Sequence, residues 1–101
     1  MPSMSTYFIT RHPGAVAWAI EQGIVIDHAV EHLVVEAIQP GDTVIGTLPV
    51  HLAAQVCERG ARYRHLSVDI PPHARGGEFT AAELEAYGAR LESYRVERGY
   101  D

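Results

Sequence analysis

Apolar positions along this chain fall into short continuous runs that alternate with stretches of helical spacing. The segment 6–10, TYFIT, is rich in β-branched and aromatic residues and predicts a strand. Apolar residues then recur at helical intervals from Ala15 to Ile20, and Gly23 follows as a stop signal. The next apolar run, 24–35, is mostly β-branched and predicts an extended segment.

The middle of the chain repeats this alternation. A turn at 39–42, QPGD, leads into a short apolar strand at 43–46. Pro49 suits the first position of a helix, and apolar residues continue along one face of that helix up to Gly60. The segment 62–70, RYRHLSVDI, alternates in the manner of a further strand.

A loop at 71–78 separates this strand from a last predicted helix. Thr80 and Glu83 have the spacing of a capping box, which marks the start of that helix. Its expected apolar stripe consists of Leu84, Tyr87, Leu91 and Tyr94. The predicted order is therefore β-α-β-β-α-β-α, an α/β fold with a mainly parallel central sheet, and residues 1–101 form a single domain.

Composition agrees with a small packed domain. The chain has 101 residues, of which 47% are hydrophobic, so it has enough apolar surface for one core. The single cysteine, Cys57, excludes an internal disulfide. The first ten residues lack the pattern of a signal peptide, and no run of 18 apolar residues occurs. We therefore expect a cytoplasmic protein with no membrane partner.

The charge balance limits the kinds of ligand that the protein is suited to bind. The formal net charge is −5, and all eight basic residues are arginines. An acidic protein of this kind is a poor candidate for coating duplex nucleic acid, which requires a basic surface. A small anionic ligand in a locally positive pocket remains compatible with this charge.

Two strand-to-helix junctions carry the residues that suit such a ligand. In open α/β sheets, ligands bind beyond the carboxyl ends of the strands, where helix N-termini present partial positive charge. Side by side, the two junctions would form an anion cradle from backbone N–H groups, a guanidinium, an imidazole and a hydroxyl. The first junction contains Thr10, Arg11, His12 and Gly14, and the second contains Gly46, Thr47, Pro49 and His51.

Each of these residues also has a purely structural interpretation. His12 would cap a turn, Arg11 would pair with a carboxylate such as Asp69, and Thr47 would cap the second helix. Arg75 lies in a glycine-containing loop. It is either a solvent-exposed residue with no contact to the ligand or part of a lid over the ligand.

The segment HAVEH, residues 28–32, matches the inverted zinc-protease pattern H-x-x-E-H. That chemistry needs both histidines on one helical face, together with a third ligand. The flanking residues favour a strand, in which His28 and His32 are too far apart for one metal ion. We therefore expect ordinary histidines here and no metal site.

Several segments together resemble a known family. TYFITRHPGAVAWA, IQPGDTVIGTLPVHLAAQVCERGARYRHLSVDIP, ARGGEFTAAEL and ARLESYRVER are similar to small CRISPR-associated accessory proteins encoded beside type III systems. Some members of that family are described as ring nucleases. The resemblance spans roughly residues 5 to 98.

The resemblance implies a Rossmann-like domain related to the CRISPR-associated Rossmann (CARF) sensors. It implies a homodimer that degrades cyclic tetra-adenylate, the second messenger of type III antiviral signalling, without metal or cofactor. Arg11 and His12 are the expected catalytic residues, and Thr10, Gly14, Gly46, Thr47, Pro49, His51 and Arg75 are the expected ligand-binding residues. One alternative is a protein that binds the messenger without cutting it. A third is a structural subunit of a CRISPR complex.

Overall fold

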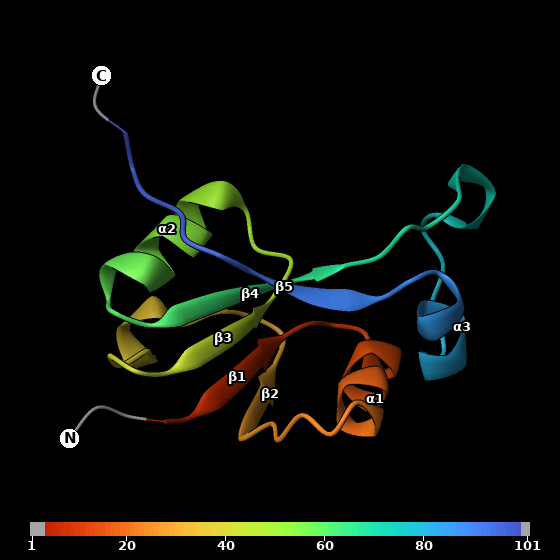
Figure 1. Cartoon of the computed structure of the whole chain (residues 1–101), viewed down its shortest axis with the longest axis horizontal. Coiled ribbons are helices and arrows are strands. Elements are labelled where there is room, and N and C mark those ends of the chain that lie inside the picture. Colours follow the sequence, from red (N-terminus) through yellow and green to blue (C-terminus); the bar gives the residue numbers. More distant parts are fainter. Residues whose placement is uncertain (1–3, 100–101) are drawn as a thin grey trace.

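A five-stranded sheet organises residues 4–99, the part of the chain that the computed structural model describes (Figure 1). Its spatial order is β2-β1-β3-β4-β5. The first four strands are parallel, and β5 runs antiparallel to β4, so the sheet is mixed but mostly parallel, as predicted. The strands are β1 (Thr6–Ile9), β2 (His28–Val30), β3 (Thr43–Gly46), β4 (Arg62–Ser67) and β5 (Arg90–Tyr94).

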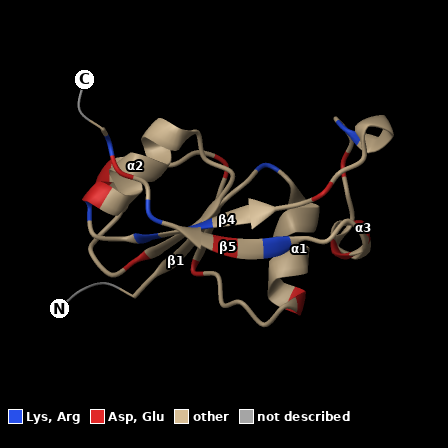
Figure 2. Cartoon of the chain, turned by 45° about the horizontal axis from the view of Figure 1, so that its top comes forward, with Lys and Arg blue, Asp and Glu red and all other residues tan. Residues whose placement is uncertain are grey.

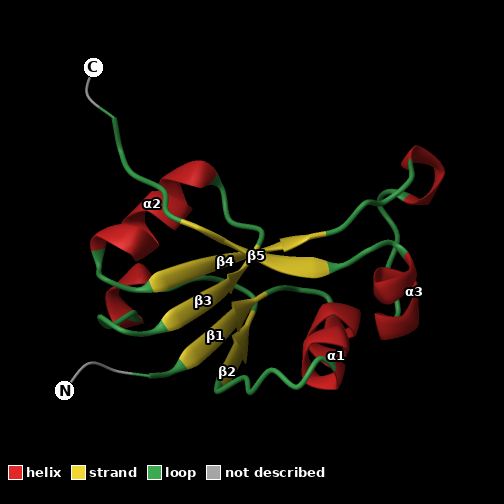
Figure 3. Ribbon diagram, in the orientation of Figure 1, coloured by secondary structure: helices red, strands yellow, loops and turns green. Residues whose placement is uncertain are grey.

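Helices cover both faces of this sheet (Figure 3). Helices α1 (Pro13–Glu21) and α3 (Ala81–Ala86) pack on one face, and α2 (Val50–Glu58) packs on the other. Two 3-10 turns, η1 (Val35–Ala37) and η2 (Pro72–Ala74), lie in the connections. Within residues 4–99, no helix is long and apolar enough to cross a membrane.

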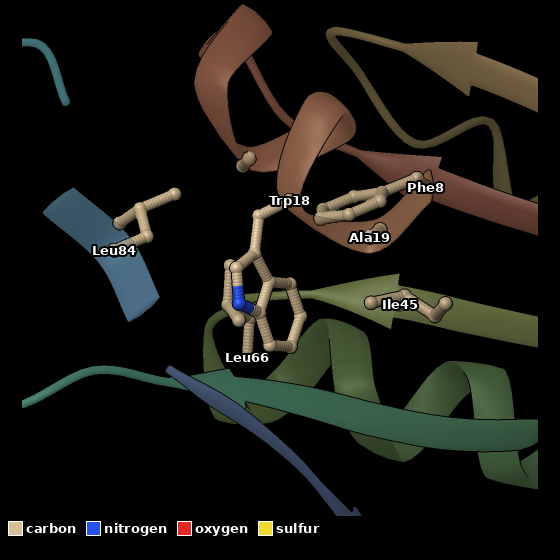
Figure 4. Close-up of a cluster of buried hydrophobic side chains, with 7 residues drawn as sticks. Phe8, Trp18, Ala19, Ile45, Leu66 and Leu84 are labelled. Atoms are coloured by element: carbon tan, nitrogen blue, oxygen red, sulfur yellow. The ribbon is translucent and has the colours of Figure 1, made fainter. Parts of the chain in front are cut away.

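The face under α1 and α3 carries the larger aromatic core. Phe8, Ile45 and Leu66 project from three neighbouring strands toward α1, where they meet Trp18 (Figure 4). Trp18 is 3% exposed, and its indole Nε1 donates to Glu85 Oε2 at 2.6 Å, which joins α1 to α3. A buried indole normally requires such a partner for its N–H. The opposite face buries Val44, Ala53, Val56 and Tyr63.

The strand order contains a topological switch point between β1 and β3. The chain adds β2 on one side of β1 and then places β3 and β4 on the other side. The helices that follow β1 and β3 cover opposite faces of the sheet, so a crevice opens beyond the carboxyl ends of these two strands. Ile9 and Gly46 end the two strands as register partners. A Cβ atom on Gly46 would lie 3.0 Å from the Ile9 carbonyl oxygen, so glycine permits this close approach.

The apolar run at 24–35 is less extended than predicted. Only β2 is a strand, and its three residues are exposed at the edge of the sheet. Three further apolar residues pack from outside the strand: Ile24 and Ile26 contact the core under α1, and Leu33 contacts the core under α2. Val25 and Val34 are exposed.

The prediction of one long final helix is wrong. The capping box of Thr80 and Glu83 is present, but α3 ends at Ala86. Gly88 follows with a positive φ of 75°, and the chain reverses into β5. Leu91 pairs across the sheet with Leu66 and packs against the core, so its burial comes from the sheet. The apolar residues of this segment have the three- and four-residue spacing of a helix, but Gly88, in the left-handed conformation, ends the helix.

Candidate functional site

A cavity of about 480 Å³ lies at the carboxyl ends of β1, β3 and β4. Both predicted junctions contribute to its wall, which places them side by side as expected. Apolar residues such as Phe8, Leu66 and Phe79 form much of the lining. The polar lining residues are Thr10, His12, Thr47, His65, Ser67 and Asp69.

The junction between β1 and α1 is held by backbone contacts. The Thr10 N–H donates to the Val30 carbonyl at 2.9 Å, and Thr10 Oγ1 accepts the His12 N–H at 3.1 Å. His12 occupies the N-cap position of α1, but its side chain makes no capping hydrogen bond. Its imidazole Nδ1 instead lies 3.1 Å from Glu78 Oε2, in the segment that leads to α3. The ring therefore faces the rim of the cavity.

Arg11 extends into solvent beside this junction. Its guanidinium forms no hydrogen bond or ion pair with any residue between 4 and 99. The alternative partner, Asp69, pairs with Arg90 Nη1 at 3.2 Å. Arg11 does not line the cavity itself, but it is adjacent to His12, which does. An unpaired guanidinium at this position is suited to a phosphate.

The junction between β3 and α2 differs from the expected cap. Pro49 is the N-cap residue, α2 begins at Val50, and no side chain caps the helix. Thr47 therefore does not have the capping role, and it lines the cavity together with Gly46. Pro49 does not line the cavity.

Gly14 and His51 lie away from this cavity. A Cβ atom on Gly14 would lie 1.8 Å from the Phe79 carbonyl oxygen, so the glycine permits α1 to pack against the segment before α3. His51 is exposed on the first turn of α2, where it lines a separate depression with Val96 and Arg98. Neither residue forms part of the cavity wall.

The segment after β4 projects beyond the sheet and then turns back toward α3 (Figure 1). Arg75 is exposed in this segment, immediately after η2, and does not line the cavity. Gly77 and Phe79 of the same segment do line it. This loop therefore reaches the cavity through Gly77 and Phe79, and not through the predicted Arg75.

The end of β4 contributes residues that the motif analysis did not select. His65 and Ser67 follow Tyr63 at alternate positions on one face of the strand, and both line the cavity. The signal was present in the sequence, because a third parallel strand ends at the same edge as β1 and β3. Their position at the cavity depends on the register between β3 and β4, in which His65 is the partner of Gly46.

The polar rim of the cavity contains both signs of charge. Ser67 Oγ donates to Glu92 Oε1, and the Arg90 guanidinium lies between Glu92 and Asp69. Both acidic and basic positions occur on β5 (Figure 2). Burial raises the pKa of the Tyr63 hydroxyl, which therefore stays protonated at neutral pH. An apolar slot with this rim can hold a flat organic group and an attached anion.

The zinc-protease pattern at 28–32 is not helical in the structure. His28 begins β2 and stacks on the Tyr7 ring with centroids 4.6 Å apart, and His32 lies in the turn beyond the strand. In the described part of the chain, no three potential metal ligands gather. Residues 28–32 thus lie on a short strand and in the turn after it, and not on a helix.

The fold and the cavity define a small α/β protein with its candidate site at the switch point of a mostly parallel sheet. The model of the family described as "Putative CRISPR-associated protein (Cas_VVA1548)" matches residues 7–97. The chain belongs to this CRISPR-associated family. No curated protein and no solved structure matches it.

Proposed function

We propose that this protein is a ring nuclease that opens cyclic tetra-adenylate and so switches off type III CRISPR signalling. The observation that carries the proposal is the convergence of the β1–α1 and β3–α2 junctions on one cavity. Membership of a CRISPR-associated family supports the biological setting. The strand order supports a kinship with Rossmann-like sensor domains, because doubly wound sheets bind nucleotides at this switch point.

The polar rim provides contacts for a phosphodiester. Arg11 supplies a guanidinium that has no partner among residues 4–99, and His12 supplies an imidazole at the cavity edge. The Thr47 hydroxyl provides a further donor. The apolar lining around Phe8 and Phe79 is suited to an adenine base. The acidic net charge is no obstacle, since only this cleft needs local positive charge.

The proposed reaction uses the ligand's own ribose. The 2′-hydroxyl attacks the adjacent 3′-phosphate, and the 5′-oxygen of the next nucleotide leaves, which yields a 2′,3′-cyclic phosphate. This route depends on alignment of the nucleophile, phosphorus and leaving oxygen, and on stabilisation of the negative charge that develops. It requires no metal ion or cofactor. In this proposal Arg11, next to His12 at the β1–α1 junction, stabilises that charge.

The ring has approximate two-fold symmetry, and a two-fold homodimer would present the same cavity twice across its axis. Two cuts would then release linear di-adenylates. The homodimer is part of the proposal, because it lets two Arg11–His12 pairs serve one ring.

The test is incubation of excess cyclic tetra-adenylate with the protein in EDTA, with products separated by chromatography. We expect turnover of more than one ring per dimer and products ending in 2′,3′-cyclic phosphate. Rings of three and six adenylates, assayed in parallel, measure the preference for ring size. Stoichiometric binding with unchanged ring would instead identify a binding protein, and the absence of binding would favour a structural subunit.

A further inference from the structure

The Tyr63 hydroxyl lies where three polar groups meet beneath the cavity. Tyr63 is 3% exposed, and its side chain lies against the β3–α2 junction. Its Oη atom is 2.9 Å from the Leu48 backbone nitrogen and 3.1 Å from the Gly46 carbonyl oxygen. It is also 2.7 Å from Nδ1 of His65, two residues along the same strand.

A proton count determines which way these bonds run. A phenol has one proton to donate, and its oxygen accepts from other donors. The Leu48 N–H can only donate, and the Gly46 carbonyl can only accept. All three contacts are satisfied when Tyr63 donates to Gly46 and His65 Nδ1–H donates to Tyr63. The opposite arrangement, with Tyr63 donating to His65, would remove this donor from the buried Gly46 carbonyl.

We assign His65 the Nδ1–H tautomer on this donor–acceptor count, which leaves a lone pair on its other ring nitrogen, Nε2. Nε2 points away from Tyr63 and makes no hydrogen bond to any residue between 4 and 99. His65 is half-buried and lines the cavity beside Thr47. The edge of the Tyr94 ring packs against it, with centroids 5.9 Å apart. The imidazole is therefore held from two sides, with its basic nitrogen unoccupied.

His12 is less well placed for proton transfer. Its side chain is 57% exposed, and its Nδ1 contacts Glu78, whose side chain is 72% exposed. His65 instead contacts the Tyr63 hydroxyl, which is itself bonded to backbone groups of the junction that we propose binds the phosphodiester. A general base acts best when its geometry is fixed relative to the proton it removes.

We infer that His65 is the proton-transfer residue of the proposed ring-opening reaction and that Tyr63 is its positioning residue. The inference rests on the proposed function and assigns a role to a residue outside the two junction motifs. His65 Nε2 accepts the proton of the ribose 2′-hydroxyl while the 2′-oxygen bonds to phosphorus. The P–O5′ bond breaks, its electron pair leaves with the 5′-oxygen, and solvent water protonates that oxygen. The imidazolium then returns its proton to solvent.

The kinetic test compares His65→Gln and Tyr63→Phe with wild type, and His73→Gln serves as the matched control. His73 is an exposed histidine of η2 outside the cavity. Single-turnover cleavage and ring affinity are measured separately in EDTA. For His65→Gln we expect a cleavage rate about 100-fold lower with affinity within about three-fold of wild type, as for loss of a general base. Tyr63→Phe should lower the rate about ten-fold, and His73→Gln should leave it unchanged.

The second measurement does not depend on activity. Nitrogen-15 NMR of the histidine rings reports which nitrogen carries the proton, and His65 in wild type should be protonated at Nδ1. Tyr63→Phe should convert it to a mixture of tautomers without unfolding the protein. This arm remains informative where His65→Gln fails to fold.

The outcomes separate the two proposals. If wild type cleaves the ring and His65→Gln cleaves it equally fast, the role of His65 is overturned while the proposed function stands. An Nε2–H tautomer in wild type also overturns it. If wild type binds the ring without cleaving it at any pH tested, the ring-nuclease proposal itself fails.

Discussion

The two ends of the same sheet use their polar groups differently. At the amino end, Asp42 precedes β3 and is 1% exposed. Its carboxylate accepts the Ser5 N–H at 3.1 Å and the Gln39 N–H at 2.9 Å, and its own carbonyl accepts the Arg62 N–H. At the carboxyl end, the same strand opens through Gly46 and Thr47 onto a cavity.

This difference separates stability from binding. The Asp42 carboxylate at the amino end is satisfied within the protein, so it holds the segments that lead into the strands in place. At the carboxyl end, Arg11 and Nε2 of His65 have no partner among residues 4–99. Groups of that kind contribute little to folding and remain able to meet a ligand. Substitutions at the two ends should therefore change different measurements.

The largest effect is expected for Asp42→Ala at the amino end. The substitution leaves two part-buried N–H groups without this charged acceptor, which should lower the free energy of unfolding by about 3 kcal/mol. Urea denaturation measures this loss. Glu31→Gln, at an exposed acidic position, is the control and should stay within about 0.5 kcal/mol of wild type. If Asp42→Ala lowered the free energy of unfolding no more than Glu31→Gln, the polar groups at the amino end would not have this stabilising role.

Arg11→Ala at the carboxyl end should leave stability nearly unchanged and weaken ligand binding. Because the exposed guanidinium has no partner in the described chain, the free energy of unfolding should change by less than about 0.5 kcal/mol. Loss of a charge-assisted phosphate contact should weaken binding of cyclic tetra-adenylate about 10- to 100-fold. Calorimetric titration measures the affinity, with Arg62→Ala at the amino end of β4 as the control. Equal losses in the two variants would show that the arginine effect is not local.

Glu78→Gln should have a smaller and opposite effect on binding. The Glu78 carboxylate contacts His12 and competes with an incoming phosphate for that imidazole. Both groups are largely exposed, so removal of the charge should strengthen binding only about three-fold at low salt. The gain should disappear at high salt, because exposed charges are then screened. Weaker binding in this variant would mean that Glu78 supports the ligand instead of competing with it.

The smallest effect concerns stability at alkaline pH. Burial raises the pKa of Tyr63 in the folded protein above its ordinary value of 10.0, so the unfolded chain ionises first as the pH rises. The contribution of Tyr63 is therefore complete below pH 10 and decreases above it. Denaturation between pH 9 and 11 should show a steeper loss for wild type than for Tyr63→Phe. Parallel curves would contradict the burial argument.

Much of this fold follows from local patterns. The strand at 6–10, the turn at 39–42 and the capping box at Thr80 are decided by residues close in sequence, and the structure contains all three. The convergence of the two junctions was also predictable, because parallel strands end at one edge. Local patterns failed at 84–94, where the spacing of apolar residues fits a helix and only the pairing of Leu91 with Leu66 selects a strand.

The site was only partly predictable for a similar reason. Thr10, His12, Gly46 and Thr47 follow directly from the strand-to-helix junctions. The importance of His65 depends on the Tyr63 hydroxyl reaching Gly46 and Leu48 of the neighbouring strand and loop. Such a contact is set by register and twist, which a single sequence does not specify. Likewise, Gly14 is selected by a carbonyl 65 residues away in the chain, at Phe79.

A crystal structure with a cyclic tetra-adenylate analogue whose 2′-hydroxyls are methylated tests the central claim most directly, since such a ring binds without reacting. We predict a phosphate between the Thr10–His12 and Gly46–Thr47 junctions, within reach of Arg11, and an adenine against Phe79. A ring bound instead at the depression beside Cys57, Arg62 and Arg95 would contradict the account, because that surface lies at the opposite end of β4.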